Sequence, residues 1–325
     1  MKVLVTGGAG YIGSVVTATL MSRGHHVFVY DNLSHGFRGA VPKKTDLIVG
    51  DISDKANLTR VIGTIGIEAV MHFAAFIEAG ESMKVPEKYF RNNTVGSLAL
   101  LETMLETGAK NFVFSSTAAL YGEPENTPIR ETDRLHPTNA YGESKLLVEQ
   151  MLEWFHEIHG LRYASLRYFN AAGATEELGE AHRPESHLIP IILQVALGKR
   201  DSISIYGTDY STPDGTCVRD YVHVSDLAQA HILALEALEQ KPKQIYNLGN
   251  GRGFSVREVI ETARKVTGNK IRAIETPRRP GDPAVLVASS EKIQNDLGWK
   301  PAHAELEQII ASAWAWHQKH PNGYA

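Results

Sequence analysis

The sequence has a single cysteine, Cys217, in 325 residues. One thiol cannot form an intramolecular disulfide, and a structural zinc site would lack the partners it needs. Long apolar runs are missing too. The apolar run at residues 309–316 is followed directly by the polar residues His317-Gln318-Lys319, so it is well short of the roughly eighteen residues of a membrane span. Glycines interrupt the apolar start after residue 5, too early for the core of a signal peptide. We therefore expect a cytoplasmic protein with no membrane span.

An excess of charge of either sign is also missing. Lys plus Arg total 33 against 37 for Asp plus Glu, which gives a formal net charge of -4 and a pI of about 6.4. This balance argues against a nucleic acid or an anionic membrane as the partner. With 43% hydrophobic residues, the chain has material for a sizeable core and a length that suits one large or two ordinary domains. The expected partner is a small molecule.

Short β-branched runs alternate with amphipathic stretches in the first half of the chain, which is typical of a parallel sheet with helices on both faces. We predict an α/β fold with a doubly wound, Rossmann-type parallel sheet in residues 1–170 and a smaller mixed α/β domain in residues 171–325. The boundary is soft, because residues 244–248 could return to the sheet. The predicted strands are residues 2–6, 26–30, 47–50, 69–73, 111–115, 163–167 and 202–206. The predicted helices are residues 11–23, 54–65, 86–107, 140–159 and 187–197, followed by three helices capped by Ser225, by Ser255 and by Ser289 or Ser290.

A glycine-rich segment lies between the first predicted strand and helix. It satisfies a dinucleotide-binding fingerprint with Gly8, Gly10 and Gly13, and Gly7 adds a second spacing. The glycines permit a tight turn, and the helix N-terminus then faces a pyrophosphate. Asp31 follows Gly13 by eighteen residues, at the end of the second strand, where a carboxylate accepts hydrogen bonds from a ribose and repels a 2′-phosphate. This pattern favours NAD over NADP, with Asp51 as a weaker adenine-edge candidate that a capping residue would equally explain.

Tyr141 and Lys145 lie four residues apart on one face of a predicted helix. A nearby cation can stabilise a phenolate at neutral pH, although the same spacing is common on solvated helix faces. The hydroxyl residues Ser115, Ser116 and Thr117 end a buried strand upstream, at the sheet edge where such folds bind ligands. Together these features favour a catalytic site.

With these motifs the sequence resembles the extended short-chain dehydrogenase/reductase family, and within it the UDP-glucose 4-epimerases. The resemblance spans nearly the whole chain, including residues 1–13, 31–33, 72–75, 80–82, 114–122, 166–170, 215–226 and 246–249. It implies that Thr117 donates a hydrogen bond to the sugar hydroxyl, that Tyr141 is the acid/base and that Lys145 is its electrostatic partner. It implies an NAD site formed by Gly7, Gly10, Tyr11, Ile12, Gly13, Asp31, Asn32, Asp51, Ile52, Phe73, Ala74, Ala75, Asn93, Tyr141, Lys145 and Tyr168.

The same resemblance implies a site for a UDP-sugar. Its residues are Thr117, Tyr141, Asn170, His187, Leu188, Ser204, Tyr206, Arg219, Arg279, Asp282 and Leu286. Two arginines also suit a pyrophosphate physically, because planar guanidinium groups bind phosphate oxygens in pairs, although ion pairs with Asp220 or Asp282 would explain them as well. No metal site is expected, since His156 and His159 share a helix face without a third ligand.

Two positions depart from the family pattern. Ile77 stands where many bacterial relatives carry a lysine that helps to hold the cofactor, so NAD retention is open. Leu286 stands where the family uses either a large aromatic or a small residue to set the size of the sugar pocket.

Three other functions would share parts of this pattern. An epimerase of another UDP-sugar, with an N-acetyl group or a pentose, would share these motifs. A sugar-nucleotide dehydratase is less favoured, because Ala118 and Ala119 follow Thr117 where that chemistry needs carboxyl groups. A non-catalytic NAD-binding protein would not need the hydroxyl, the tyrosine and the lysine together. The resemblance further implies a homodimer through the helices that begin near Pro86 and Ala140.

Overall fold

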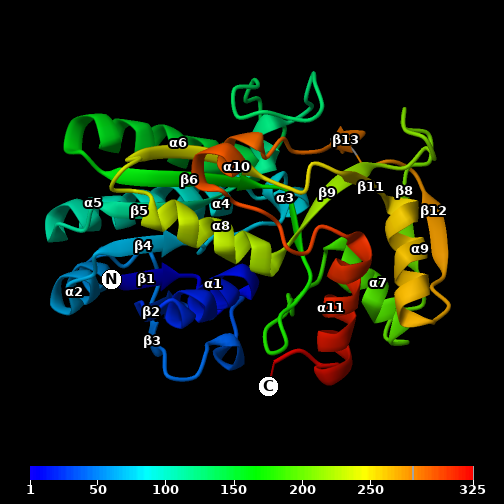
Figure 1. Ribbon diagram of the computed structural model, residues 1–325, viewed down its shortest axis with the longest axis horizontal. Helices are drawn as coiled ribbons and strands as arrows, with labels where there is room; N and C mark the ends of the chain where they lie inside the picture. Colours follow the sequence, from blue (N-terminus) through cyan, green and yellow to red (C-terminus); the bar gives the residue numbers. More distant parts are fainter. Residues whose placement is uncertain (280–281, 325) are drawn as a thin grey trace. The chain divides into compact units, whose positions relative to one another are not determined.

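A computed structural model describes residues 1–279 and 282–324 as two compact units (Figure 1). The first unit comprises Met1–Gly122, Leu135–Arg167 and Ala228–Tyr246. The second comprises Glu123–Arg134, Tyr168–Leu227 and the described residues from Asn247 onward. Each unit is therefore assembled from several separate stretches of the chain.

The first unit is built on a seven-stranded sheet in the order β10-β6-β5-β4-β1-β2-β3. β1 runs parallel to β2 and β4, β2 to β3, and β4 to β5, which confirms the predicted doubly wound parallel sheet. The segment near residue 244 does join this sheet, as β10 beside β6. The strands are β1 (Lys2–Thr6), β2 (His26–Asp31), β3 (Asp46–Val49), β4 (Ala69–His72), β5 (Asn111–Thr117), β6 (Arg162–Tyr168) and β10 (Lys243–Leu248).

Successive side chains along a strand point to opposite faces of the sheet, and here apolar side chains are buried on both faces. Leu4 of β1 lies in a buried cluster that also contains Leu58, Leu100 and Val148 from three helices, while Val3 and Val5 are buried on the opposite face. The helices are α1 (Tyr11–Ser22), α2 (Lys55–Ile65), α5 (Gly96–Thr107), α6 (Ala140–His159) and α8 (Val224–Glu236), with the short α3 (Ala79–Ser82), α4 (Pro86–Tyr89), η1 (Arg38–Ala40), η2 (Phe90–Val95) and η3 (Ala118–Tyr121).

The second unit has its own core between helices and two small sheets. β7 and β11 pair with β9, as does β13, and β8 pairs with β12. Apolar residues of α7, α9 and α11, such as Ile192, Ile260 and Ile310, fill this core. The elements are β7 (Asn170–Ala172), α7 (Leu188–Ala196), β8 (Ile203–Tyr206), β9 (Val218–His223), β11 (Gly253–Ser255), α9 (Val256–Thr267), β12 (Ala273–Thr276), β13 (Val285–Leu286), α10 (Glu291–Leu297) and α11 (Leu306–Lys319).

Two of the predictions for helices are wrong, and several other helix ends differ by one residue. Residues 86–107 form α4, the π-helical η2 and α5 in succession, rather than one regular α-helix. Ser225 lies inside α8 and does not cap it, because the Nδ1 atom of His223 accepts the hydrogen bond from the Ser225 N–H (3.1 Å). Ser255 does cap α9, through a reciprocal capping box with Glu258. Ser290 precedes α10 as expected, but its hydroxyl bonds to Gly249.

None of the helices in residues 1–279 and 282–324 combines the length and the apolar character that crossing a lipid bilayer requires.

Candidate functional site

The turn between β1 and α1 brings two strand ends close together. Gly7 has a φ of +74°, and a Cβ atom there would lie 2.5 Å from the backbone nitrogen of Ala74. A Cβ atom at Gly13 would lie 2.3 Å from the carbonyl oxygen of Gly7. The glycine turn is therefore packed against the segment formed by Phe73, Ala74 and Ala75, and any larger residue would push the two apart.

The start of α1 is suited to an anion. Gly10 is its N-cap and has no side chain to cap the first N–H groups, while Tyr11 and Ile12 form the first helical positions. The N–H groups in the first turn of a helix carry partial positive charge, which favours phosphate oxygens. The sequence-predicted glycines, Tyr11, Ile12 and residues 73–75 thus share one location in the first unit.

Asp31 lies at the end of β2 beside this turn. Its carboxylate is almost buried and accepts hydrogen bonds from the backbone N–H groups of Ala9 (3.0 Å) and Leu33 (2.8 Å). Burial raises the pKa of Asp31, and the two hydrogen bonds oppose that rise. Each carboxylate oxygen keeps a further acceptor position, which a ribose hydroxyl can use.

Asn32 and Asp51 are also brought together at the ends of β2 and β3. The Asn32 amide donates to the Asp51 carboxylate (2.7 Å), which also accepts hydrogen bonds from the N–H and hydroxyl groups of Ser53. Burial raises the pKa of Asp51, but these three hydrogen bonds outweigh it and leave the pKa below its ordinary value. Asp51 therefore stabilises the local turn, with Ile52 buried behind it.

Asn93 lies in the π-helical segment η2 and is buried. Its amide oxygen accepts a hydrogen bond from the Phe76 N–H (2.9 Å), and its amide nitrogen donates to the Phe76 carbonyl (3.0 Å) and to the Ser144 hydroxyl (3.0 Å). These bonds connect the segment after residues 73–75 to α6, the helix of Tyr141 and Lys145. The structure thus shows Asn93 as a positioning residue, and its predicted role beside the nicotinamide stays a prediction.

The predicted catalytic residues meet where β5 ends and α6 begins. Thr117 is the last residue of β5, and its hydroxyl donates a hydrogen bond to the Tyr141 phenol oxygen. Tyr141 is the second residue of α6, and Lys145 lies one helical turn further on. The Lys145 ammonium donates to the Ser115 carbonyl (2.9 Å) and lies 4.8 Å from the centre of the Phe114 ring. A phenol, a hydroxyl and a buried amine therefore share one strand end.

Burial dominates the electrostatics of this group. It raises the pKa of Tyr141, while the hydrogen bond from Thr117 favours the phenolate and lowers it. It lowers the pKa of Lys145 to about 7, so the lysine exchanges its proton near neutrality. His72 is buried between the hydroxyl groups of Thr6 and Ser97, and its pKa of about 3 keeps it neutral there.

Sequence reasoning missed the role of Ser82 at this site. Its hydroxyl accepts a hydrogen bond from the Tyr141 backbone N–H (3.0 Å) and donates to the Ala79 carbonyl (2.7 Å). Asn139 is the N-cap of α6, and its side chain accepts a hydrogen bond from the Gly142 N–H. Ser82 thus fixes the start of α6 from a segment nearly sixty residues away in sequence, a contact that no local pattern indicates.

Four of the predicted UDP-sugar residues meet in the second unit. Asp282 accepts from Arg279 (Nε–Oδ2 2.9 Å) and pairs with Arg219 (Nη2–Oδ1 3.8 Å). The Arg279 guanidinium lies 4.7 Å from the centre of the Tyr206 ring. Two cations thus share one carboxylate and leave a net positive charge. Asp220, the other candidate partner, instead accepts hydrogen bonds from three backbone N–H groups, those of Asn250, Gly251 and Ala288, and pairs with neither arginine.

The remaining predicted substrate residues lie on nearby elements of the second unit. Leu286 of β13 pairs with Arg219 of β9, and Ser204 precedes Tyr206 by two residues on β8. The Asn170 side chain bonds to Tyr221 on the adjacent strand, Leu188 begins α7, and Tyr168 ends β6. His187 is the N-cap of α7, and its Nδ1 atom faces Glu180 and Glu185. Burial opposes protonation of His187, but these carboxylates raise its pKa well above the ordinary value.

Comparison with known proteins gives consistent relatives over the full length. Residues 3–249 match the model of the NAD dependent epimerase/dehydratase family. A UDP-glucose 4-epimerase from Halalkalibacterium halodurans is 54% identical over 328 residues, which covers 100% of this chain and 98% of that protein.

Solved structures are similarly close. A crystal structure of a UDP-glucose 4-epimerase superposes with a TM-score of 0.97 at 51% identity and covers 100% of both chains. The UDP-glucose 4-epimerase from Bifidobacterium longum, in complex with NAD+ and UDP, has a TM-score of 0.95 at 38% identity and again covers 100% of both chains.

Proposed function

Because the chain belongs to the NAD dependent epimerase/dehydratase family, we propose that it interconverts UDP-galactose and UDP-glucose through a 4-keto intermediate. The observation that carries the proposal is the hydrogen bond between Thr117 and Tyr141 at the carboxyl end of β5, with Lys145 one helical turn away. This set provides a group that moves a proton and a second group that holds the same oxygen.

The described residues fit NAD. The contact between Gly7 and Ala74 leaves no room for a side chain, and the side-chain-free start of α1 offers N–H groups to a pyrophosphate. Asp31 provides acceptor positions for a ribose and opposes a 2′-phosphate. We assign Gly7, Gly10, Gly13 and Asp31 the main part in holding the cofactor. These residues would hold NAD, which would supply a reversible hydride acceptor for C4 of the sugar, so the reaction would have no net redox change.

The residues of the chain handle the proton. The Tyr141 phenolate accepts the proton of the 4-hydroxyl, and the Thr117 hydroxyl donates a hydrogen bond to the same sugar oxygen. The Lys145 ammonium stabilises the phenolate electrostatically and so opposes the burial that raises the pKa of Tyr141; burial also lowers the pKa of Lys145 to about 7, and the positive charge of an oxidised nicotinamide would add to the stabilisation. After the keto sugar has turned its other face, Tyr141 returns the proton to the oxygen on C4.

Arg219 and Arg279 are assigned to the diphosphate of the nucleotide. Both now share Asp282, so an incoming diphosphate with more negative charge can take over their donor groups. A firm hold on UDP with few contacts to the sugar allows the sugar to turn. We place Tyr206, Asn170 and Leu188 beside the nucleotide and Leu286 beside the sugar.

The family also contains dehydratases, and the site favours epimerisation. Elimination of water from the sugar requires an additional acid and base beside the catalytic hydroxyl. The residues that follow Thr117 are Ala118 and Ala119, the first of them buried in η3. Without carboxyl groups there, the keto sugar is reduced again.

The direct test incubates the purified protein with UDP-galactose and follows UDP-glucose by NMR. We expect conversion to an equilibrium mixture. Absence of turnover with UDP-hexoses, UDP-N-acetylhexosamines and UDP-pentoses would contradict the proposal and favour a non-catalytic NAD-binding protein.

A Tyr141→Phe variant tests the assigned acid/base. We expect kcat to fall by at least about a hundredfold, with NAD content and thermal unfolding unchanged. Tyr163→Phe is the matched control, because it removes a hydroxyl that binds Glu153 outside the site. Retention of more than about a tenth of the wild-type kcat in Tyr141→Phe would show that another group moves the proton.

A homodimer is part of the proposal. It is supported by two apolar side chains of α6, Trp154 and Ile158, which are each 67% exposed in the single chain. Light scattering of the purified protein tests it, and a monomer at micromolar concentration would contradict it.

A further inference from the structure

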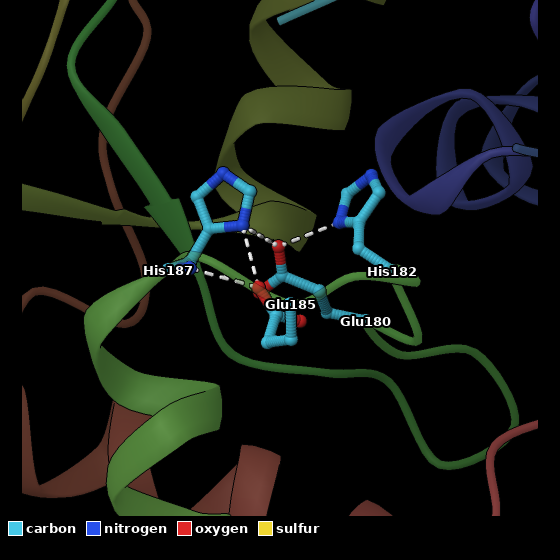
Figure 2. A group of neighbouring side chains, drawn as sticks. All are labelled: Glu180, His182, Glu185 and His187. Carbon is cyan, nitrogen blue, oxygen red and sulfur yellow. Dashed lines mark hydrogen bonds and ion pairs between the residues drawn. The ribbon is translucent and has the colours of Figure 1, made fainter. Parts of the chain in front are cut away.

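Four side chains from the segment before α7 converge on one point. Figure 2 shows Glu180, His182, Glu185 and His187 directed toward one another. The Glu180 carboxylate is 2.9 Å from the His187 Nδ1 atom and 3.0 Å from the His182 Nδ1 atom, and Glu185 is 2.8 Å from His187. All four potential ligand atoms lie within 4.8 Å of one another. His187 is also among the residues predicted for the UDP-sugar, whereas Glu180, His182 and Glu185 belong neither to that set nor to the proposed catalytic group.

The two carboxylates, Glu180 and Glu185, are buried with little positive charge around them. The side chains of Glu180 and Glu185 are only 6% and 5% exposed, and in the described parts of the chain neither forms an ion pair with a lysine or arginine. The Nδ1 atom of His187 faces both carboxylates but carries at most one hydrogen. The Nδ1 atom of His182 faces Glu180 alone, so these two imidazoles are the ion-pair partners of the two buried carboxylates among the described residues, and a further cation would lower the cost of burying them.

We propose that Glu180, His182, Glu185 and His187 bind a Zn²⁺ ion through two imidazole nitrogens and two carboxylate oxygens. Zinc bonds of about 2.0–2.1 Å place tetrahedral ligand atoms roughly 3.3 Å apart. The three shortest contacts, of 2.8 to 3.0 Å, need to lengthen by a few tenths of an ångström, and the widest pair, which lies within 4.8 Å, needs to close by at most about 1.5 Å. The charge of the ion balances the two carboxylates.

The ligand types distinguish zinc from other common ions. Ca²⁺ and Mg²⁺ prefer oxygen ligands in sets of six or more, whereas two imidazoles with two carboxylates suit a first-row transition ion. Four protein ligands leave no open position, which is typical of a structural zinc site rather than a catalytic one. The role of this site is therefore structural: it would fix the conformation of the segment from Glu180 to His187.

The held segment leads directly into α7. The Glu185 carboxylate accepts hydrogen bonds from the backbone N–H groups of Ser186 (2.9 Å) and His187 (2.8 Å), so the backbone already orients one ligand. His187 is the N-cap of α7 and Leu188 its first residue. A zinc ion would thus join the loop of Glu180 and His182 to the start of this helix and stabilise both.

Metal analysis of untagged, full-length protein tests the proposal without reference to catalysis. We expect about one zinc per chain by mass spectrometry after dialysis against micromolar Zn²⁺, and a tetrahedral visible spectrum after replacement by Co²⁺. His182→Ala and Glu185→Ala should each weaken zinc binding about a hundredfold in competition with a chromogenic chelator. His159→Ala, an exposed histidine on α6, is the matched control and should keep the ion.

Thermal unfolding separates lost binding from lost folding. Zinc should raise the melting temperature of the wild type and of His159→Ala, while His182→Gln should melt like the zinc-free wild type with or without the ion. Wild-type protein that binds no zinc at micromolar concentration would overturn the proposal. Zinc content in His182→Ala equal to that of the wild type would overturn it as well, because the ion would then lie elsewhere.

Discussion

Replacing Lys145 with methionine should stabilise the folded protein in the absence of NAD, although it removes a catalytic group. Lys145 is buried, and its pKa falls from 10.5 to about 7 on folding. Each pKa unit corresponds to about 1.4 kcal/mol, so the buried ammonium destabilises the fold by at most about 5 kcal/mol below pH 7. The variant also loses the hydrogen bond to the Ser115 carbonyl, which lowers its free energy of unfolding by about 1 kcal/mol. We expect a net gain of about 1–4 kcal/mol, since methionine fills a similar volume.

The sign of the pH dependence follows from the lowered pKa. Between pH 7 and 10.5 the unfolded lysine binds more protons than the folded one, so the wild type gains stability as the pH rises. The advantage of Lys145→Met should therefore be complete below pH 7 and vanish toward pH 10.5.

Urea and thermal unfolding of NAD-free protein at pH 6, 8 and 10 measure this effect. Lys110→Met, a change at an exposed lysine, is the matched control and should show no such trend. A Lys145→Met variant that is less stable than the wild type at pH 6, or a gain that does not depend on pH, would refute the reasoning.

The other predictions concern cofactor, substrate and positioning. Asp31→Ala should weaken NAD binding and relax the bias against NADP in calorimetric titrations; equal wild-type affinity for both cofactors would contradict the assignment. Because Ile77 supplies no charge, part of the protein should purify without NAD and be activated by adding it, and full occupancy would show that other contacts compensate. The wild type should prefer plain UDP-hexoses over UDP-N-acetylglucosamine by about ten- to a hundredfold in kcat/KM, and Leu286→Ser should narrow that gap; no change would remove Leu286 as the size-determining residue. Ser82→Ala should lower kcat several-fold at unchanged KM, since it frees the Tyr141 N–H; a change in KM alone would show that Ser82 acts on substrate binding.

Local patterns were sufficient for the parts of this protein that depend on neighbouring residues. β1 and α6 have the predicted bounds, because alternation and helical periodicity are properties of a short segment. The glycine turn was also predictable, because a Cβ atom at Gly10 or Gly13 would meet the carbonyl oxygen of Gly7 within the same strand-turn-helix unit. Ser255 was recognised as a cap for the same reason.

The features that sequence reasoning missed depend on distant contacts. The π-helical turn at Asn93 coincides with its hydrogen bonds to Phe76 and Ser144, which a periodic apolar pattern does not reveal. His223 replaces Ser225 as the cap of α8 because its ring happens to face the helix start. The ligands from Glu180 to His187 lie in irregular chain with no periodicity, so only the folded structure shows that they converge.

The position of β10 has a consequence for dissecting the protein. The strand that completes one edge of the first sheet is made more than seventy residues after β6, the strand it pairs with. A fragment that stops at residue 170 would end with β6 as an exposed edge, whose free N–H and C=O groups invite pairing with other chains. Nascent protein leaving the ribosome carries the same open edge until residue 248 has emerged. Premature termination between these points should therefore yield aggregates rather than a small cofactor-binding domain.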